Sequence, residues 1–597
     1  MKTNIQTKNG YTDGLTINPA IIPNLKNKIL FLTRSAYFRF NGASPISTYL
    51  RKHGINSRII ETATSKFMDK TYRRENIGNK WVIDEIVKED TDIIGISLLC
   101  LDITYFCNLF DELISSYPDM NKKLFVFGGA GAITAAEFIV GAFPFIKNMV
   151  VVASAGEEIM RMIAESKDID EIVKNSDKFP YTMIKNGETV IDNRELTDTE
   201  LLQKRTALYD VYREALDGMD NQLESKGAFG ESGLVTPNNI EYLPEAFNIH
   251  LELGCKARCS FCSFSNADYF KKIKLRRYEP EEFHGIVGEI VQIILDVGRE
   301  NHIERLRFTG ENIFENKQFL EKLCDGLLEV KDELGGIDFW STGMPVDVSK
   351  RMDFSLLEKM KEVGFHSITL GIETYDKQLM KDMRKSCTVE MNFDAVKKLN
   401  QAGITAICTS LMFYPTATMT SILNDLTAII TLYEEDTIYI AFHPVLLAIH
   451  ETKMSIDFKD CIEYDEVPTQ SGIIKIPKYV RPRDKKIKDI QIELMKRGFH
   501  IIEQLEKEIP NIVLTRTFEG LIYLKMLCDQ LGETELADRY WAALQDYYKY
   551  YPKKYRKTFG KIFHKISKSP TTNLSDPTHT WIERDAYPQW KSHDGRA

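Results

Sequence analysis

Three cysteines with the spacing CxxxCxxC lie in the short stretch GCKARCSFCSF at residues 254–264. Thiolates bind zinc and iron–sulfur clusters, and they also form disulfides and redox-active pairs. A structural zinc site needs four ligands, and His250, which could supply the fourth, falls inside an expected strand. The next cysteine along the chain, Cys324, begins no second CxxC pair. A four-ligand zinc site is therefore disfavoured, although it stays open on the residues alone.

A cluster with three protein ligands fits Cys255, Cys259 and Cys262 better. A disulfide is disfavoured because the chain shows no secretory signal, and a thioredoxin-like pair would not need Cys255. A [4Fe–4S] cluster held by three cysteines leaves one iron with an open position, where a small molecule can bind and react. The spacing therefore favours an iron–sulfur site with one vacant coordination position.

The elements that position this loop form an alternating series. The expected strand FNIHLELG (247–254) leads into the cysteines, and five further apolar strands follow, separated by segments with helical spacing: HIERLRFTG, GIDFWSTG, SITLGIET, AICTSLMFY and TIYIAFHP. Such alternation predicts an α/β arrangement, a partial TIM barrel over residues 246–460. Functional residues of parallel barrels lie at the carboxyl ends of the strands, where the cysteines also stand.

A second alternating series covers residues 27–166. Short buried strands such as KILFLT (28–33) and DIIGISLL (92–99) alternate with helix-length segments, so we expect a doubly wound, Rossmann-like parallel sheet. The strand KLFVFGG (123–129) ends in glycines, which allow a ligand to approach the backbone. No GxGxxG follows the first strand, as a dinucleotide fold would require.

Composition bounds the remaining possibilities. The chain has 597 residues, 43% of them hydrophobic and 27% charged, with ten cysteines and a net charge of −9. This length exceeds a single core, so we expect several domains. No run approaches the roughly 18 apolar residues that cross a bilayer, and we expect a cytoplasmic protein without a membrane partner. The negative net charge gives no global attraction for nucleic acid.

The other segments are less regular. We expect residues 1–26 to be an N-terminal extension, residues 167–245 a polar linker and residues 461–597 a mostly helical domain. The stretch 549–568 carries eight Lys or Arg and no acidic residue. Basic residues interleaved with aromatic ones can bind nucleic acid, but a helix that packs its apolar face on the barrel is favoured. That apolar face comprises Phe559, Ile562, Phe563 and Ile566.

The cysteine loop, with Phe261 before its third cysteine and a barrel strand in front, resembles that of the radical S-adenosylmethionine superfamily. The resemblance implies that Cys255, Cys259 and Cys262 hold a [4Fe–4S] cluster whose open iron binds S-adenosylmethionine. Reduction of the cluster then cleaves the sulfonium to methionine and a 5′-deoxyadenosyl radical, which abstracts hydrogen from a substrate. A reductant such as flavodoxin or ferredoxin is therefore an expected partner.

Further positions match this superfamily at later strand ends. In RLRFTGENIF (305–314), Glu311 falls where the family binds the methionine amine of S-adenosylmethionine. In SITLGIET (367–374), Glu373 resembles the end of a Gly-x-Glu strand near the ribose hydroxyls. Ser341, at the end of GIDFWST, is a further expected polar contact to S-adenosylmethionine.

The front domain resembles cobalamin-binding domains. Ser97 and Leu99 match their Ser-x-Leu element, and Gly128 and Gly129 match their Gly-Gly element at a typical distance along the chain. ASAGEEIM (153–160) resembles the segment that ends such domains in front of radical S-adenosylmethionine barrels. The resemblance implies that the glycines admit the nucleotide tail of cobalamin and that Ser97 hydrogen-bonds it.

One element of the cobalamin pattern is absent. Domains that coordinate cobalt carry Asp-x-His-x-x-Gly after the first strand, and here residues 37–42 read YFRFNG, with Arg39 in the place of the histidine. Arginine stays protonated and has no lone pair for a metal. If cobalamin binds, we expect Arg39 to face cobalt without ligating it.

Together these resemblances indicate a cobalamin-dependent radical S-adenosylmethionine enzyme. Its expected fold is α/β, with an N-terminal Rossmann-like cobalamin-binding domain, a radical S-adenosylmethionine partial TIM barrel and a helical C-terminal domain. The expected reaction is methyl transfer to a carbon centre of a small-molecule or peptide substrate. Rearrangement or cyclisation of the substrate is the alternative within this class, and a non-enzymatic cobalamin sensor is a third possibility. A methylthiotransferase would need three cysteines in the front domain, which has only Cys100 and Cys107.

Overall fold

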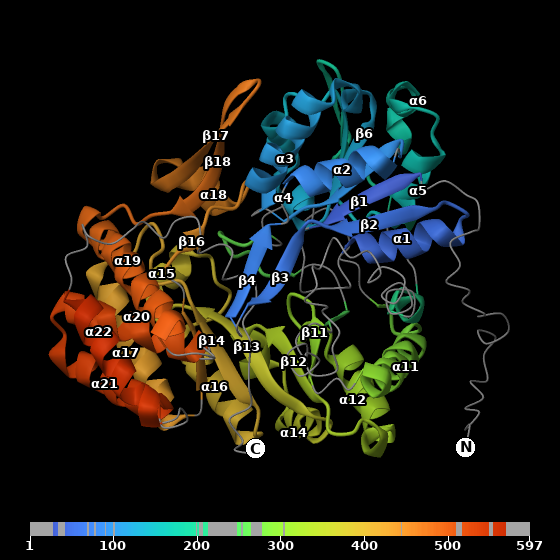
Figure 1. The fold of residues 1–597 in the computed structure, drawn as a ribbon. Helices are drawn as coiled ribbons and strands as arrows, with labels where there is room; N and C mark the ends of the chain where they lie inside the picture. The colour runs from blue at the N-terminus through green and yellow to red at the C-terminus, as the bar shows by residue number, and fades with distance from the viewer. Residues whose placement is uncertain are drawn as a thin grey trace.

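The computed structural model shows three parts: a front α/β domain, a partial barrel beneath it and a group of C-terminal helices to one side (Figure 1). The structure describes residues 28–33, 42–68, 71–76, 79–89, 91–99, 102–198, 200–201, 204, 207–212, 248–251, 255–263, 278–301, 305–436, 438–442, 444–508, 516–548 and 553–568. Within these ranges, no helix is long and apolar enough to span a bilayer.

The front domain is built on a seven-stranded sheet in the order β2-β1-β5-β6-β7-β8-β9, parallel from β2 to β7. The order of its first five strands is that of a doubly wound fold, with the change of direction between β1 and β5. The strands are β1 (Ile29–Thr33), β2 (Ser57–Glu61), β5 (Ile93–Ser97), β6 (Leu124–Gly128), β7 (Asn148–Val152), β8 (Thr182–Asn186) and β9 (Thr189–Asp192). A separate hairpin, β3 (Ala63–Met68) and β4 (Thr71–Asn76), follows β2.

Helices cover both faces of this sheet because its strands are apolar on both sides. Alternate residues of β5 point to opposite faces, so Ile93 packs with α1 and α5 whereas Ile94 packs with α2, α3 and α4. The helices are α1 (Ala43–Lys52), α2 (Asn79–Glu89), α3 (Ile103–Ser116), α4 (Ala130–Ala142) and α5 (Glu157–Glu165). The expected Rossmann-like fold is confirmed.

The front sheet continues beyond residue 166. Strands β8 and β9, together with the short helix α6 (Ile169–Lys174), lie in the range 167–245 that we expected to be a linker. Both strands are antiparallel to their neighbours, and β9 is largely exposed, so neither carries the apolar run of a buried parallel strand. Their sequences therefore resemble a connecting segment.

The second part is a six-stranded parallel sheet in the chain order β10-β11-β12-β13-β14-β15. Its strands are β10 (Asn248–His250), β11 (Arg305–Thr309), β12 (Asp338–Gly343), β13 (Phe365–Glu373), β14 (Thr405–Ser410) and β15 (Ile438–Phe442). Its covering helices are α11 (Phe283–Asn301), α12 (Lys317–Glu329), α14 (Phe354–Glu362), α16 (Val389–Gln401) and α17 (Met419–Glu435). Six parallel strands in chain order, with these five helices between them, form the expected partial barrel.

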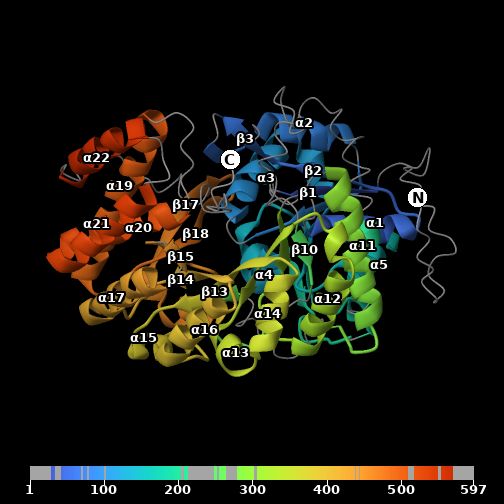
Figure 2. The ribbon, with the colours of Figure 1, turned by 90° about the horizontal axis from the view of Figure 1, so that it is seen from below.

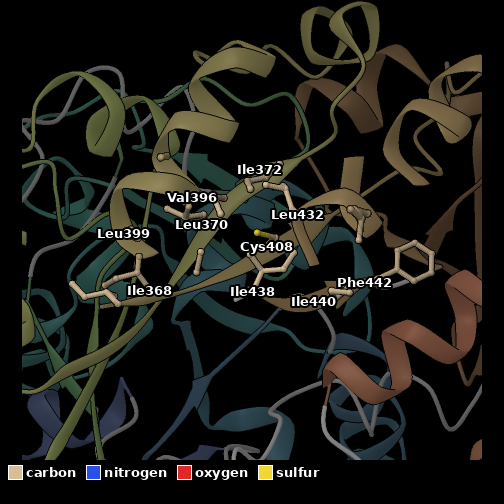
Figure 3. Close-up of a cluster of buried hydrophobic side chains, with 14 of the residues drawn as sticks. Ile368, Leu370, Ile372, Val396, Leu399, Cys408, Leu432, Ile438, Ile440 and Phe442 are labelled. Atoms are coloured by element: carbon tan, nitrogen blue, oxygen red, sulfur yellow. The ribbon is translucent and has the colours of Figure 1, made fainter. Parts of the chain in front are cut away.

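Alternation along each barrel strand separates a core face from an inner face. Ile368, Leu370 and Ile372 of β13 lie with Val396, Leu399 and other apolar side chains between the sheet and its helices (Figure 3). The residues between them, Thr369 and Gly371, point to the inner side of the barrel. The inner side is the face on which ligand-contacting side chains of this sheet must lie.

The third part of the chain follows the last barrel strand, β15, and begins with further strands. A hairpin of β17 (Ile462–Thr469) and β18 (Gly472–Val480) reaches the front domain, where Val467 and Ile476 enter the core around α3. Helices α19 (Lys485–Glu508), α20 (Arg516–Leu531), α21 (Thr534–Tyr548) and α22 (Lys553–Ser567) then pack beside α17 and β15 (Figure 2). The expected apolar face of α22 is buried in the barrel's core, as the packing interpretation predicts.

Gly498 and Gly560 provide a matched test of helix packing in the C-terminal part. A Cβ at Gly498 would overlap the ring of the buried Tyr523, whereas a Cβ at Gly560 meets no atom within 4 Å. Gly498→Ala should therefore destabilise the protein by about 1–3 kcal/mol through overpacking. Gly560→Ala should stabilise it by about 0.5–1 kcal/mol, because alanine loses less entropy in a helix. Urea denaturation followed by circular dichroism measures both, and equal effects would contradict this packing.

Candidate functional site

The cysteine loop follows β10 at the inner edge of the barrel. Cys259 is 5% exposed, and Cys255 and Cys262 are partly buried. None of the three forms a disulfide with a residue that the structure describes, and the Sγ of Cys255 accepts a hydrogen bond from the Ala257 amide at 3.4 Å. The structure thus places three cysteines in the thiol form on one short loop.

Ser260 anchors this loop to neighbouring segments through hydrogen bonds. Its amide donates to the Met383 carbonyl at 2.9 Å, and its carbonyl accepts from the Met454 amide at 2.8 Å. Its hydroxyl lies 2.8 Å from the hydroxyl of Tyr414, which is fully buried. A small apolar cluster that contains Tyr414, Met383 and Met454 also contacts Phe261 of the loop. The backbone between Cys259 and Cys262 is therefore held by both hydrogen bonds and packing.

Burial opposes ionisation of these thiols. Desolvation raises the pKa of Cys255 to about 12, and the charges of Glu315, Cys262 and Cys259 add to the rise. Burial also raises the pKa of Cys259 to about 11, although the neighbouring Lys385 lowers it in part. Thiolates are the form that binds metal, so this loop needs a positive partner to ionise.

Lys385 supplies a partly buried positive charge beside the loop. Burial lowers the pKa of its ammonium, but the charges of Cys259, Glu373, Cys387 and Cys262 outweigh that effect and the net pKa is raised. Its Nζ donates to the Gly371 carbonyl. A cation held in this position favours negative charge on the thiols and on the Glu373 carboxyl.

Gly371 keeps a small space open between these groups. A Cβ at this position would lie 3.3 Å from Oε1 of Glu373, 3.5 Å from Nζ of Lys385 and 3.8 Å from the sulfur of Met344. The carboxylate, the ammonium and the thioether therefore surround one point on the inner face of β13. Glycine at this point leaves room for a ligand to approach the strand.

Glu373 adopts a strained backbone conformation with φ of 69°. The pairing of β13 with β14 shifts register between Leu370 and Glu373, and the Thr409 hydroxyl accepts the Ile372 amide across the gap. Irregularities of this kind re-aim a side chain, and a non-glycine residue with positive φ marks a functional or over-determined position. Burial raises the pKa of Glu373, and Lys385 and Thr409 lower it in part.

A buried carboxyl fixes the turn that follows Glu373. Asp425 of α17 accepts hydrogen bonds from the Thr374 hydroxyl at 2.9 Å and from the Tyr375 amide. Asp425 is fully buried, and desolvation raises its pKa to about 7 against the hydrogen bonds that lower it. Below about pH 7, a protonated carboxyl thus holds the end of β13 in place.

Two of the predicted contacts to S-adenosylmethionine, Glu311 and Ser341, lie in different surroundings. Glu311 lies two residues beyond β11 on a partly exposed loop, and the neighbouring Asn312 accepts from the Met344 amide at 3.1 Å. Ser341 is fully buried and donates to the Phe308 carbonyl at 2.8 Å. It shares the helix-facing side of β12 with Phe339, so Thr342, on the opposite side, is the residue of this strand that faces the barrel interior.

The inner face below Glu373 holds a cation and an indole. The guanidinium of Arg307 lies 4.3 Å from the ring centroid of Trp340, and the indole nitrogen of Trp340 donates to Thr369 at 3.0 Å. These three side chains come from three neighbouring strands, β11 to β13. They give the barrel interior a layer that combines apolar surface with positive charge.

The predicted cobalamin residues meet at the carboxyl edge of the front sheet. Ser97 pairs with Thr33 on one side and with Gly128 on the other. Gly129 has φ of 89°, and a Cβ there would lie 2.9 Å from the Leu98 carbonyl and 3.4 Å from Oγ of Ser97. Only glycine fits this approach without strain. Leu99 follows on the same edge, and its amide donates to Asp102 at 3.3 Å.

Arg39 lies outside the residues that the structure describes, so its predicted position facing cobalt stays a prediction. His450 is described, and it stacks on Phe138 of α4 with ring centroids 3.4 Å apart. Burial lowers the pKa of His450 to about 4, which keeps the ring neutral in this stack.

The stack of His450 on Phe138 places the two sheet edges close together. His450 lies on the chain that leaves the carboxyl end of β15, and α4 begins beside Gly129 at the carboxyl end of β6. Glu451, the next residue, accepts from the Glu137 amide at 3.3 Å and pairs with Arg194 at 3.6 Å. The front domain thus lies over the carboxyl edge of the barrel (Figure 1).

Three residues of this site were not found from the sequence: Lys385, Tyr414 as a support of the loop, and Asp425. Lys385 stands in MRKSC, where two adjacent cations next to a cysteine are a weak signal. Asp425 lies inside an apolar helix, and a lone carboxyl in an apolar stretch is a signal for a buried, partnered group. Their hydrogen-bond partners lie 14 to 154 positions away along the chain, which no local pattern reveals.

Comparison with known proteins matches residues 252–428 to the radical SAM superfamily. Over 215 residues the chain is 25% identical to a Methanocaldococcus jannaschii protein named as a methylthiotransferase, covering 35% of this chain and 45% of that protein. Over 166 residues it is 25% identical to a Pyrococcus horikoshii protein named as an uncharacterized methyltransferase, covering 28% of this chain and 32% of that protein. Both matches span less than half of the relative's length.

Two solved structures share the fold over most of the chain. The methyltransferase TsrM of Kitasatospora setae, solved with tryptophan and an S-adenosylmethionine analogue, aligns at 15% identity with a TM-score of 0.53, covering 76% of this chain and 85% of that one. The cobalamin-dependent radical enzyme OxsB, solved with aqua-cobalamin, aligns at 14% identity with a TM-score of 0.54, covering 92% and 84%. The likeness establishes the fold, including the front domain and the helical C-terminal part.

Tyr414→Phe tests the support of the cysteine loop. The substitution keeps the ring but removes the hydroxyl that contacts Ser260, so the loop should open more often. We expect alkylation of the buried Cys259 by iodoacetamide, followed by mass spectrometry, to be about two- to tenfold faster, as the loss of one hydrogen bond implies. Tyr540→Phe is the control, because it removes a buried hydroxyl that donates to Leu426 away from this loop. Equal labelling of Cys259 in both variants would refute this support.

Asp425→Asn tests the pH dependence of the turn after Glu373. The folded pKa of Asp425 is raised to about 7, so its protonated form contributes stability that is present below the unfolded pKa and is lost as pH rises through 7. Relative to the variant, the wild type should lose roughly 2–4 kcal/mol of unfolding free energy between about pH 5 and pH 8. Urea denaturation at both pH values measures this, with the exposed Asp538→Asn as control. A constant difference between Asp425→Asn and the wild type would disprove the buried neutral carboxyl.

Proposed function

We propose that this chain, which carries a radical SAM domain at residues 252–428, is a cobalamin-dependent radical S-adenosylmethionine enzyme that transfers a methyl group to a carbon centre of a small molecule or peptide. The single observation that carries the proposal is that the carboxyl edges of the two sheets, each predicted to bind a cofactor, lie next to each other. The cysteine loop ends β10 of the barrel, and the Ser97 and Gly129 edge ends β5 and β6 of the domain above it.

The residues of the loop fit a [4Fe–4S] cluster better than a single metal ion. Within the described part of the chain, no three Cys, His, Asp or Glu side chains lie close enough to hold one ion together. In a three-cysteine cluster each thiolate binds a different iron, so Cys255, Cys259 and Cys262 would stand farther apart than the ligands of one ion. Lys385 would offset part of the negative charge that three thiolates bring into a buried site.

The groups around Gly371 would hold S-adenosylmethionine. Its amine and carboxylate need an acid and a cation. Glu311, after β11, and Lys385, beside the cysteine loop, are the candidates. Glu373, turned inward by the irregularity of β13, would accept from the ribose hydroxyls. Ser341 faces the helices, so we assign the contact of this strand to Thr342 instead. S-adenosylmethionine bound there would supply a carbon-centred radical or a methyl group.

The edge of the front sheet fits the nucleotide tail of cobalamin. Gly128 and Gly129 leave backbone exposed where a side chain would block it, and Ser97 offers a hydroxyl beside them. We propose that Ser97, Leu99, Gly128 and Gly129 form this cradle and that Arg39 lies toward cobalt. The layer of Arg307 and Trp340 in the barrel interior would then form the floor beneath the substrate.

The reaction is tested by product analysis after anaerobic reconstitution with iron, sulfide and cobalamin. S-adenosylhomocysteine together with 5′-deoxyadenosine supports radical methyl transfer. Deoxyadenosine without S-adenosylhomocysteine would support the alternative, rearrangement or cyclisation of the substrate. S-adenosylhomocysteine without deoxyadenosine would indicate methyl transfer without hydrogen abstraction. Absence of both products with an intact cluster would favour a cobalamin sensor and overturn the proposal of an enzyme.

Replacement of the loop cysteines tests the cluster itself. Cys259→Ala should lose the brown colour, most of the bound iron and all cleavage of S-adenosylmethionine, because a ligand is missing. Cys324→Ala is the matched control: it removes a fully buried thiol from the core face of the same barrel. It should keep iron at the wild-type level while lowering stability by about 1 kcal/mol. Iron retained in Cys259→Ala, measured by a ferrozine assay, would defeat the assignment.

A further inference from the structure

The outer side of the cysteine loop carries exposed positive charge. Lys256 and Arg258 stand between the cysteines, and the side chain of Lys256 is 61% exposed. Arg258 is also exposed and forms no ion pair with any residue that the structure describes. The loop that carries three buried or partly buried cysteines therefore also carries two exposed cations.

Two further cations continue this surface at the end of helix α15 (Lys377–Asp382). The hydrogen bond from the Ser260 amide to the Met383 carbonyl places the loop directly against this helix end. Lys381 and Arg384, on either side of that contact, are exposed, and across the described ranges neither makes a salt bridge. We call Lys256, Arg258, Lys381 and Arg384 the basic patch.

An exposed apolar residue lies at the border of the basic patch. Helix α18 (Lys453–Asp457) touches the loop through the hydrogen bond from the Met454 amide to the Ser260 carbonyl. Ile456, in this helix, is 53% exposed, which is rare for a large apolar side chain in this protein. A small apolar contact rimmed by charge is the composition of weak, transient protein interfaces.

The nearby acids are engaged with partners of their own. Glu315 lies beneath Lys256 with 5% of its side chain exposed, at 3.7 Å from the ammonium. Asp457 pairs with Lys453, and Asp382 accepts from Thr416 and Gln378. Arg258, Lys381 and Arg384 therefore remain as excess positive charge, although the whole chain carries −9. A local field of the opposite sign favours a negatively charged partner at this place.

We infer that the basic patch docks a small acidic one-electron carrier protein of the flavodoxin type, which delivers the electron to the cysteine site. The inference rests on the proposed function, because only a redox cluster would need the electron. In the step, the carrier hydroquinone loses one electron and becomes a semiquinone, and the cluster gains that electron. No bond forms between the two proteins. The patch suits this role because the thiols of Cys255 and Cys259 lie one or two residues from Lys256 and Arg258, and electron transfer slows steeply with distance.

The other basic surface of the molecule serves as an internal control. On α22, Lys557, Lys561 and Lys565 are exposed, while the opposite face of this helix packs in the core near α19 and α20. This helix lies in the outer part of the C-terminal helices, far from β10, the strand that precedes the cysteine loop (Figure 2). It offers a similar charge without a route to the thiols.

The test compares two reductants in the reconstituted enzyme. Arg258→Glu/Lys381→Glu should raise the KM for reduced flavodoxin by about tenfold or more, because charge reversal removes the attraction that steers association. With dithionite, a small reductant that needs no docking, turnover should stay within about twofold of the wild type. The control variant Lys557→Glu/Lys561→Glu should match the wild type with both reductants.

Binding supplies a readout that does not depend on turnover. Isothermal titration calorimetry with oxidised flavodoxin should show a Kd about tenfold weaker for Arg258→Glu/Lys381→Glu, and a wild-type Kd that weakens with added salt. Unchanged KM and Kd in this variant would overturn the inference while leaving the proposed function intact. Absence of turnover with dithionite in the wild type would instead count against the proposed function, and the calorimetry would still decide whether the basic patch docks the carrier.

Discussion

Parallel pairing of buried strands is the constraint on which the rest of this structure depends. A parallel sheet must be covered on both faces or closed into a barrel, so packing occupies its faces and leaves the carboxyl edge for loops with other tasks. Both sheets of this chain obey the constraint. It places Ser97 beside Gly128 on one edge, and the cysteine loop near Glu373 on the other. The stack of Phe138 on His450 then brings the two edges together.

The cost of burying charge shapes the barrel edge. Desolvation raises the pKa values of Cys255, Cys259 and Glu373, which disfavours the ionised forms that bind metals and cations. Lys385 counters this effect from within the same space. Glu373 holds a strained backbone, and the turn after it is fixed by a carboxyl that is itself fully buried. Strain and desolvation are concentrated at the point where the cofactor would bind, and the surrounding helices supply the stability that maintains them.

Much of this arrangement could be predicted from the sequence, because it follows from local pattern. Alternating apolar strands and helical segments predict both sheets, and the resemblance of the three cysteines to radical S-adenosylmethionine proteins agrees with the match of residues 252–428 to that superfamily. The extent of the front domain could not be predicted, since β9 is an exposed edge strand and β8, although buried, has only two apolar residues in its sequence. Alternate residues of β12 face opposite sides of the sheet, so a shift of one residue decides whether Ser341 faces the helices or the barrel interior. Composition does not determine this. Lys385 and Asp425 act through partners on other elements, so only the fold reveals them.

The central claim is that the two sheet edges serve one site with two cofactors. Electron paramagnetic resonance of the reconstituted chain, loaded with cob(II)alamin and a cluster in equal amounts, tests this claim most directly. If both bind at the adjacent edges, reduction of the cluster places a second unpaired spin nearby, and the cob(II)alamin signal should broaden or split. A cob(II)alamin signal that stays the same before and after reduction of a fully occupied cluster would contradict a shared site.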